Sequence, residues 1–94
     1  MYSIFFFFSF TIKEKGENTM LDAVIVGKVI KHYREKKGIS QEVLSGFADI
    51  GRTHLSAIER GERKPTLETF YRISLALEVK ASELWQTIEN EIGT

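Results

Sequence analysis

The sequence predicts an all-α domain of five short helices. Apolar residues recur at spacings of three and four from about residue 25 to residue 92, and the chain contains one proline. Glycine or a capping side chain stands near the ends of most of these apolar stretches. With 94 residues, 43% of them hydrophobic, the chain has material for one small domain and no more.

The first helix is expected over residues 22–37, with Lys36 and Lys37 in its last turn and Gly38 as its stop. Ser40 is a good N-cap for a second helix. The expected buried side of that helix is Val43, Leu44, Phe47 and Ala48.

A tight turn is expected over residues 49–51, because Asp tolerates a left-handed backbone and Gly adopts any. A third helix follows from Arg52 to Arg60, with Leu55 and Ile58 pointing inward and Gly61 ending it.

Thr66 is the expected cap of a fourth helix. Its apolar residues at core spacing are Leu67, Phe70, Ile73, Ala76 and Leu77. A fifth helix is expected from Ala81 to Ile92, with Leu84, Trp85 and Ile88 on its apolar side.

The first nineteen residues differ from the rest and are expected to be a non-native or disordered leader. The run MYSIFFFFSFTI is too short to span a bilayer and lacks the features of a signal peptide. Lys15-Gly16-Glu17 back-translates to AAAGGAGAA, a purine-rich sequence like a ribosome-binding site ahead of Met20. We therefore expect residues 1–19 to be upstream sequence and residues 20–94 to be the domain. A real N-terminal arm is the alternative.

Charge is distributed unevenly, although the formal net charge is zero. Between Lys31 and Lys64 there are eight Lys or Arg residues and five acids, whereas residues 65–94 hold two bases and five acids. A basic middle suits nucleic acid, and the acidic end could meet a partner subunit. The absence of cysteine excludes a disulfide framework, a thiolate nucleophile and a Cys-based zinc site, and it fits a reducing cytoplasm.

The third helix has the chemistry of a reading helix for the DNA major groove, which admits one α-helix held out from a rigid body. Its inward residues leave small, polar and cationic side chains facing out. These are Arg52, Thr53, Ser56, Ala57 and Arg60, with His54 at the margin.

Residues 25–84 resemble the helix-turn-helix domain of the lambda/434 repressor and Cro family, often called the XRE family. The matching residues are Gly38-Ile39-Ser40-Gln41-Glu42-Val43-Leu44, Ile50, Arg52, Leu55-Ser56, Ile58-Glu59-Arg60-Gly61, Pro65-Thr66-Leu67-Glu68 and Ser82-Glu83-Leu84. Gly51 departs from the family's usual Ser, Thr or Asp cap of the recognition helix.

The resemblance implies roles for individual residues. Base reading falls to Arg52, Thr53, Ser56 and Ala57, with Arg52 the strongest discriminator because it can bind guanine bidentately. Phosphate contacts fall to Gln41, His54, Arg60, Arg63 and Lys64. Arg34 and Glu59 match a structural ion pair between the first and third helices.

Tyr71 and Leu75 lie off the core stripe of the fourth helix, which suggests a symmetric dimer interface. That interface is expected to contain Tyr71, Leu75, Trp85, Ile88 and Ile92, although the last three could instead complete the core.

The function predicted is that of a sequence-specific DNA-binding transcriptional regulator in the cytoplasm, acting as a homodimer on a near-palindromic operator. The alternative is an antitoxin-type module that covers a toxin, with or without autoregulatory DNA binding. No nucleophile–base set, paired carboxylates or phosphate loop is evident, so we expect no enzymatic activity, cofactor or metal, and no membrane association.

Overall fold

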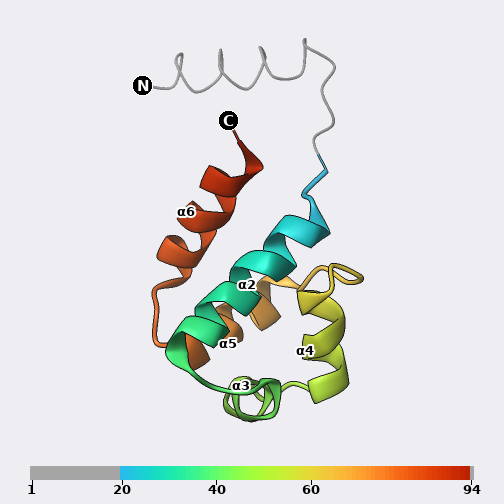
Figure 1. Cartoon of the computed structure of the whole chain (residues 1–94), viewed down its shortest axis with the longest axis vertical. Helices are drawn as coiled ribbons and strands as arrows, with labels where there is room; N and C mark the ends of the chain where they lie inside the picture. The colour runs from blue at the N-terminus through green and yellow to red at the C-terminus, as the bar shows by residue number, and fades with distance from the viewer. Residues whose placement is uncertain (1–19, 94) are drawn as a thin grey trace.

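The computed structural model describes residues 20–93, and the predicted leader of residues 1–19 lies outside them. These residues form five α-helices and no strands, which confirms the predicted fold class. In Figure 1 the long helix α2 crosses the middle of the molecule, with α6 along one side and α4 on the other. The helices are α2 (Ala23–Lys37), α3 (Gln41–Ala48), α4 (Arg52–Glu59), α5 (Leu67–Leu77) and α6 (Ala81–Ile92).

Local chemistry sets the helix ends at the positions that the sequence predicts. The Ser40 hydroxyl accepts a hydrogen bond from the Val43 N–H at 3.1 Å, and the Thr66 hydroxyl accepts one from the Thr69 N–H at 3.1 Å. Gly38 adopts the left-handed region at φ 79° and ends α2. Asp49 adopts the same region at φ 56° and turns the chain from α3 towards α4.

One continuous core joins all five helices. Its members are apolar side chains with at most 5% exposure: Val26, Val29, Ile30, Leu44, Ala48, Leu55, Ile58, Ile73, Leu77, Leu84 and Ile88. Helix α2 packs against α4 on one side and α6 on the other, while α3 packs against α4 and α5. The pair α3–α4 is therefore held to the rest of the domain from two directions.

Three residues expected in the core are exposed instead: Val43 by 40%, Phe47 by 69% and Leu67 by 85%. Val43 and Phe47 form one row along α3, about 100° around the helix from the row of Leu44 and Ala48. Only the second row is buried. Leu67 is the first residue of α5, where the helix begins at the surface.

Candidate nucleic-acid interface

Helix α4 is fixed to the body by its inner side and is open on its outer side. Leu55 and Ile58 are completely buried, and α4 packs against both α2 and α3. Arg52 and Thr53, in the first turn, are exposed, and Ser56 and His54 are partly exposed. The first turn of α4 thus presents a guanidinium and a hydroxyl to solvent from a rigid base.

The N-terminus of α4 differs from the other helix starts in residues 20–93. Asp22, Ser40 and Thr66 cap α2, α3 and α5 with side-chain hydrogen bonds, and α6 has Glu83 in its first turn. Helix α4 has Gly51 as its N-cap, no side-chain cap bond and no acidic residue in its first turn. A helix N-terminus carries a partial positive charge, and a cation placed there is unfavourable by about 0.3–1 kcal/mol. The charge of Arg52 adds to this partial positive charge at the start of α4. The first turn of the helix supplies no anion to neutralise either of them.

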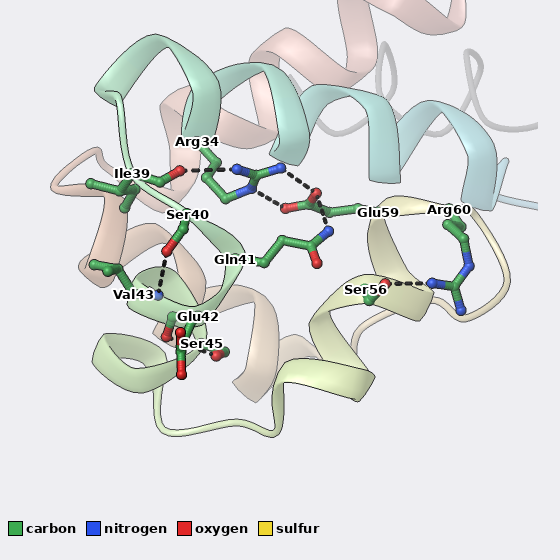
Figure 2. A network of polar contacts seen from close by, with 10 residues as sticks. All are labelled: Arg34, Ile39, Ser40, Gln41, Glu42, Val43, Ser45, Ser56, Glu59 and Arg60. Carbon is green, nitrogen blue, oxygen red and sulfur yellow. Dashed lines mark hydrogen bonds and ion pairs between the residues drawn. The ribbon is translucent and has the colours of Figure 1, made fainter.

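A buried carboxylate ties the two helices of the turn to α2 (Figure 2). Glu59 accepts hydrogen bonds from Arg34 Nε at 2.7 Å and from Arg34 Nη2 at 2.9 Å, while Arg34 Nη1 donates to the Ile39 carbonyl at 2.9 Å. The side chains of Glu59 and Arg34 are 2% and 11% exposed. The hydrogen bond to Glu59 raises the pKa of Arg34, and burial opposes this shift, so the guanidinium stays charged. The predicted Arg34–Glu59 ion pair is present.

Gln41 joins the same carboxylate, a contact that the sequence did not suggest. Its Nε2 atom donates to Glu59 Oε1 at 2.9 Å, and Figure 2 shows the amide pointing from the start of α3 towards the end of α4. An amide nitrogen carries two N–H groups, so one donor remains for another acceptor. Gln41 is therefore oriented by a buried partner and keeps a donor free.

Arg60, at the end of α4, is bound by an acid of its own chain. Its Nε and Nη2 atoms donate to the two carboxylate oxygens of Glu62 at 2.8 and 3.0 Å, and Nη1 donates to the Ser56 hydroxyl. The hydrogen bond from Arg60 lowers the pKa of Glu62, and the same bond raises the pKa of Arg60. The sequence analysis did not predict the contact between Arg60 and Glu62. The available signal for it was an acid two residues after Arg60, across Gly61. Arg63 and Lys64, further along the loop, are exposed as expected.

Ala57 is not on the open side of α4, which corrects the prediction that it reads bases. It is 8% exposed, and the adjacent Ile58 and Glu59 are buried as well. The eight-residue helix is covered by two neighbours, so its open strip is narrower than the sequence pattern suggested. The methyl group of Ala57 has little surface left for a base.

Ile88 is likewise misplaced in the predicted dimer interface, because it is completely buried in the core of a single chain. Tyr71 and Trp85 are 54% and 40% exposed, and both line an apolar groove of about 1030 Å³ between the N-terminal ends of α5 and α6. Leu67 lines it too, and Ile88 contributes to its wall. Leu75 and Ile92 are exposed but do not line this groove.

Leu75 lines a second, smaller cavity. It has a volume of about 370 Å³ and is lined by Lys37, Phe47, Leu75, Ala76 and Glu78. The residues predicted to share one interface are therefore divided: Tyr71, Trp85 and Ile88 line the groove, Leu75 lines the smaller cavity, and Ile92 lines neither.

Residues 20–93 contain no cluster of three His, Cys, Asp or Glu side chains that could hold a metal ion. None of the helices in that range is long and apolar enough to cross a bilayer.

Comparison with known proteins identifies helix-turn-helix regulators and control proteins as similar to this chain. The profile of the family described as helix-turn-helix matches residues 30–84. The control protein C.MunI of a Mycoplasma species is 39% identical over 64 residues, covering 68% of this chain and 86% of that protein. The HTH-type transcriptional regulator y4dJ of Sinorhizobium fredii is 37% identical over 71 residues, covering 74% and 92%.

Solved structures agree with the sequence relatives. The controller protein C.Esp1396I, solved on a 19-base-pair DNA duplex, superposes with a TM-score of 0.72 and 32% identity. The match covers 80% of this chain and all of that one.

Proposed function

The chain belongs to the helix-turn-helix family of the lambda/434 repressor and Cro (XRE) type, and from this premise we propose that it is a sequence-specific DNA-binding transcriptional regulator without catalytic activity. The observation that carries the proposal is the start of α4. It has an exposed Arg52, no side-chain cap and no acid in its first turn, on a helix with a buried inner side. Such a helix end suits the acceptor-rich edge of guanine and the nearby phosphates.

Arg52 is the main base-reading residue in this proposal, with Thr53 and Ser56 as weaker readers. Arg52 and Thr53 occupy the first two positions of the helix, from which side chains reach base edges when the N-terminal turn enters the groove. Ala57 is left out because it is buried.

Gln41 is the proposed phosphate contact of α3, through the N–H that Glu59 leaves free. The backbone N–H groups at the start of α3 would assist it. His54, Arg63 and Lys64 are further phosphate contacts in the proposal, and all three are at least partly exposed. The similarity to the control protein C.MunI and to the restriction-modification controller protein C.Esp1396I supports a regulator that binds DNA through this domain.

Arg52→Ala tests the reading role. A bidentate arginine–guanine contact contributes about 1–3 kcal/mol of discrimination, which is roughly a 5- to 150-fold loss of preference for a selected site over a random duplex. Arg72→Ala, on α5, is the matched control and should leave site preference unchanged. Circular dichroism checks that both variants fold. Unchanged site preference in Arg52→Ala, or a wild-type affinity without salt dependence, would contradict the proposal.

We also propose that the protein acts as a homodimer through the groove lined by Leu67, Tyr71 and Trp85. Exposed aromatic and aliphatic groups around a hollow of this size favour a protein partner, and a second copy supplies the same groups by two-fold symmetry. A symmetric dimer would place two α4 helices in successive major grooves, about 34 Å apart on a near-palindromic site.

The two apolar hollows make this second proposal easy to test. Tyr71→Glu places a charge in the large groove, whereas Leu75→Glu places one in the smaller cavity beside Phe47. Sedimentation velocity should show dissociation for Tyr71→Glu and a dimer for Leu75→Glu. The reverse result would assign the interface to the smaller cavity.

A further inference from the structure

Glu62 forms an ion pair with Arg60, a cation next to the open side of α4. Two hydrogen bonds, at 2.8 and 3.0 Å, join its carboxylate to the guanidinium of Arg60 in the fork-to-fork geometry that also suits phosphate. Both side chains are more than half exposed, at 59% and 53%. The contact is therefore accessible to a competing anion.

The backbone at Gly61, between Arg60 and Glu62, is fixed by its surroundings. The ion pair is therefore positioned by the backbone and not only by its two long side chains. Gly61 lies at φ 79°, and a Cβ there would come within 2.8 Å of the Val24 Cα atom. The Glu62 N–H also donates to the Ala57 carbonyl at 2.9 Å. This turn presents Glu62 to Arg60 in the isolated domain.

The remaining guanidinium nitrogen extends the link to the open side of α4. Arg60 Nη1 donates to the Ser56 hydroxyl, so Glu62, Arg60 and Ser56 form one chain of contacts along the outer edge of the helix. Arg60 is thus turned towards Ser56 and has its phosphate-binding fork occupied.

We propose that Glu62 is a positioning residue, which occupies the phosphate-binding fork of Arg60 and thereby weakens the sequence-independent attraction of the protein to DNA. The inference rests on the proposed function of α4. Phosphate contacts strengthen binding to all DNA sequences alike, whereas base contacts distinguish them. An internal carboxylate that competes with phosphate for Arg60 therefore lowers non-specific affinity and leaves the Arg52 contact untouched.

The lowered pKa of Glu62 supports this role, because the carboxylate remains ionised at neutral pH. The neighbouring Arg63 and Lys64 stay exposed in the same loop. Glu62 thus occupies Arg60 in an ion pair and leaves Arg63 and Lys64 available for phosphate.

The test measures binding of the full chain to a random-sequence duplex over a range of salt concentrations. Glu62→Gln should bind the random duplex up to about tenfold more tightly at low salt, with a salt slope steeper by about 0.9 for each chain bound. Its affinity for a selected site should rise by a similar factor, so the ratio of specific to random affinity should stay near that of the wild type. Glu62→Asp keeps the carboxylate and should stay near wild type.

Two further variants separate the Arg60 contact from the change in net charge. Glu78→Gln removes one exposed carboxylate from another ion pair, with Lys37 at a cavity that no α4 residue lines, and should leave the salt slope unchanged. Arg60→Gln/Glu62→Gln should lose the gain of the single variant. The proposal is wrong if Glu62→Gln behaves like Glu78→Gln, or if the double variant keeps the gain. Failure of the wild type to bind any duplex in a salt-dependent way would instead overturn the proposed function.

Discussion

Gly27 of α2 faces the backbone carbonyl of Ile58 so closely that a Cβ at Gly27 would lie 2.2 Å from that oxygen. The Glu59 carbonyl would be 2.8 Å from the same atom. The last turn of α4 therefore approaches α2 to backbone contact. This approach holds the helix that carries Arg52 at a fixed distance from the body of the domain.

Gly27→Ala should destabilise the domain, because backbone oxygens cannot turn aside as a flexible side chain can. Overpacking of this kind costs about 1–3 kcal/mol and sometimes more, which lowers Tm by roughly 4–8 °C for each kcal/mol in a domain of this size. Thermal unfolding followed by circular dichroism measures it. Gly46→Ala in α3 is the control: its Cβ meets nothing within 4 Å, so the variant should be neutral or slightly more stable. Equal stability of the two variants would refute the close contact.

Glu59→Gln should be among the most damaging substitutions in the molecule. It removes the charge that compensates Arg34, whose side chain is only 11% exposed. An amide has only one acceptor oxygen, so it cannot accept from both Nε and Nη2 of Arg34 as the two carboxylate oxygens do. Breaking a buried pair in this way costs about 3–5 kcal/mol. Urea unfolding tests it, with Glu68→Gln, from the exposed Arg72 pair, as a control that should change stability by less than about 1 kcal/mol.

A hydrogen bond joins α2 to α6 between the hydroxyls of Tyr33 and Thr87, 2.7 Å apart, in addition to their shared apolar core. Thr87 also donates to the Glu83 carbonyl at 3.2 Å, so Tyr33 is the donor of the pair. Tyr33→Phe should cost about 0.5–1.5 kcal/mol. A double-mutant cycle with Thr87→Val should show that the two losses are not additive. Strict additivity would mean that the hydroxyls do not interact.

Lys37 holds the pKa of the Glu78 carboxyl below its ordinary value of 4.5 through a hydrogen bond, with Coulomb attraction as the second cause. A carboxyl with a lowered folded-state pKa adds stability at pH values above 4.5, and this stability is lost as the pH falls through the lowered pKa. Lys37→Ala should raise the pKa of Glu78 towards 4.5, measured by NMR titration of its carboxyl carbon. Lys36→Ala should not; a shift of equal size in both would point to general charge effects.

The sequence was sufficient for the helix ends because these depend on local chemistry. Ser40 and Thr66 cap the helices that follow them, and α6 spans the expected Ala81–Ile92. Each of these features is decided within four or five residues. The same holds for the left-handed turn at Asp49.

The open and covered sides of each helix were harder to predict, because they depend on which neighbour lies against it. Phe47 has the spacing of a core residue but lies on the exposed row of α3, and it is 69% exposed. Ala57 has the opposite outcome, buried by the packing around α4. The contacts Gln41–Glu59 and Arg60–Glu62 also depend on side-chain placement, which spacing does not specify.

The groove between α5 and α6 contains its own optical reporter. Trp85 is the only tryptophan in the sequence, and it lies 40% exposed on the wall of that groove. Indole emission shifts to shorter wavelength as water is excluded from around the ring. Burial of the groove by a second chain would therefore register as a blue shift that reverses on dilution, so that unlabelled protein reports its own subunit equilibrium.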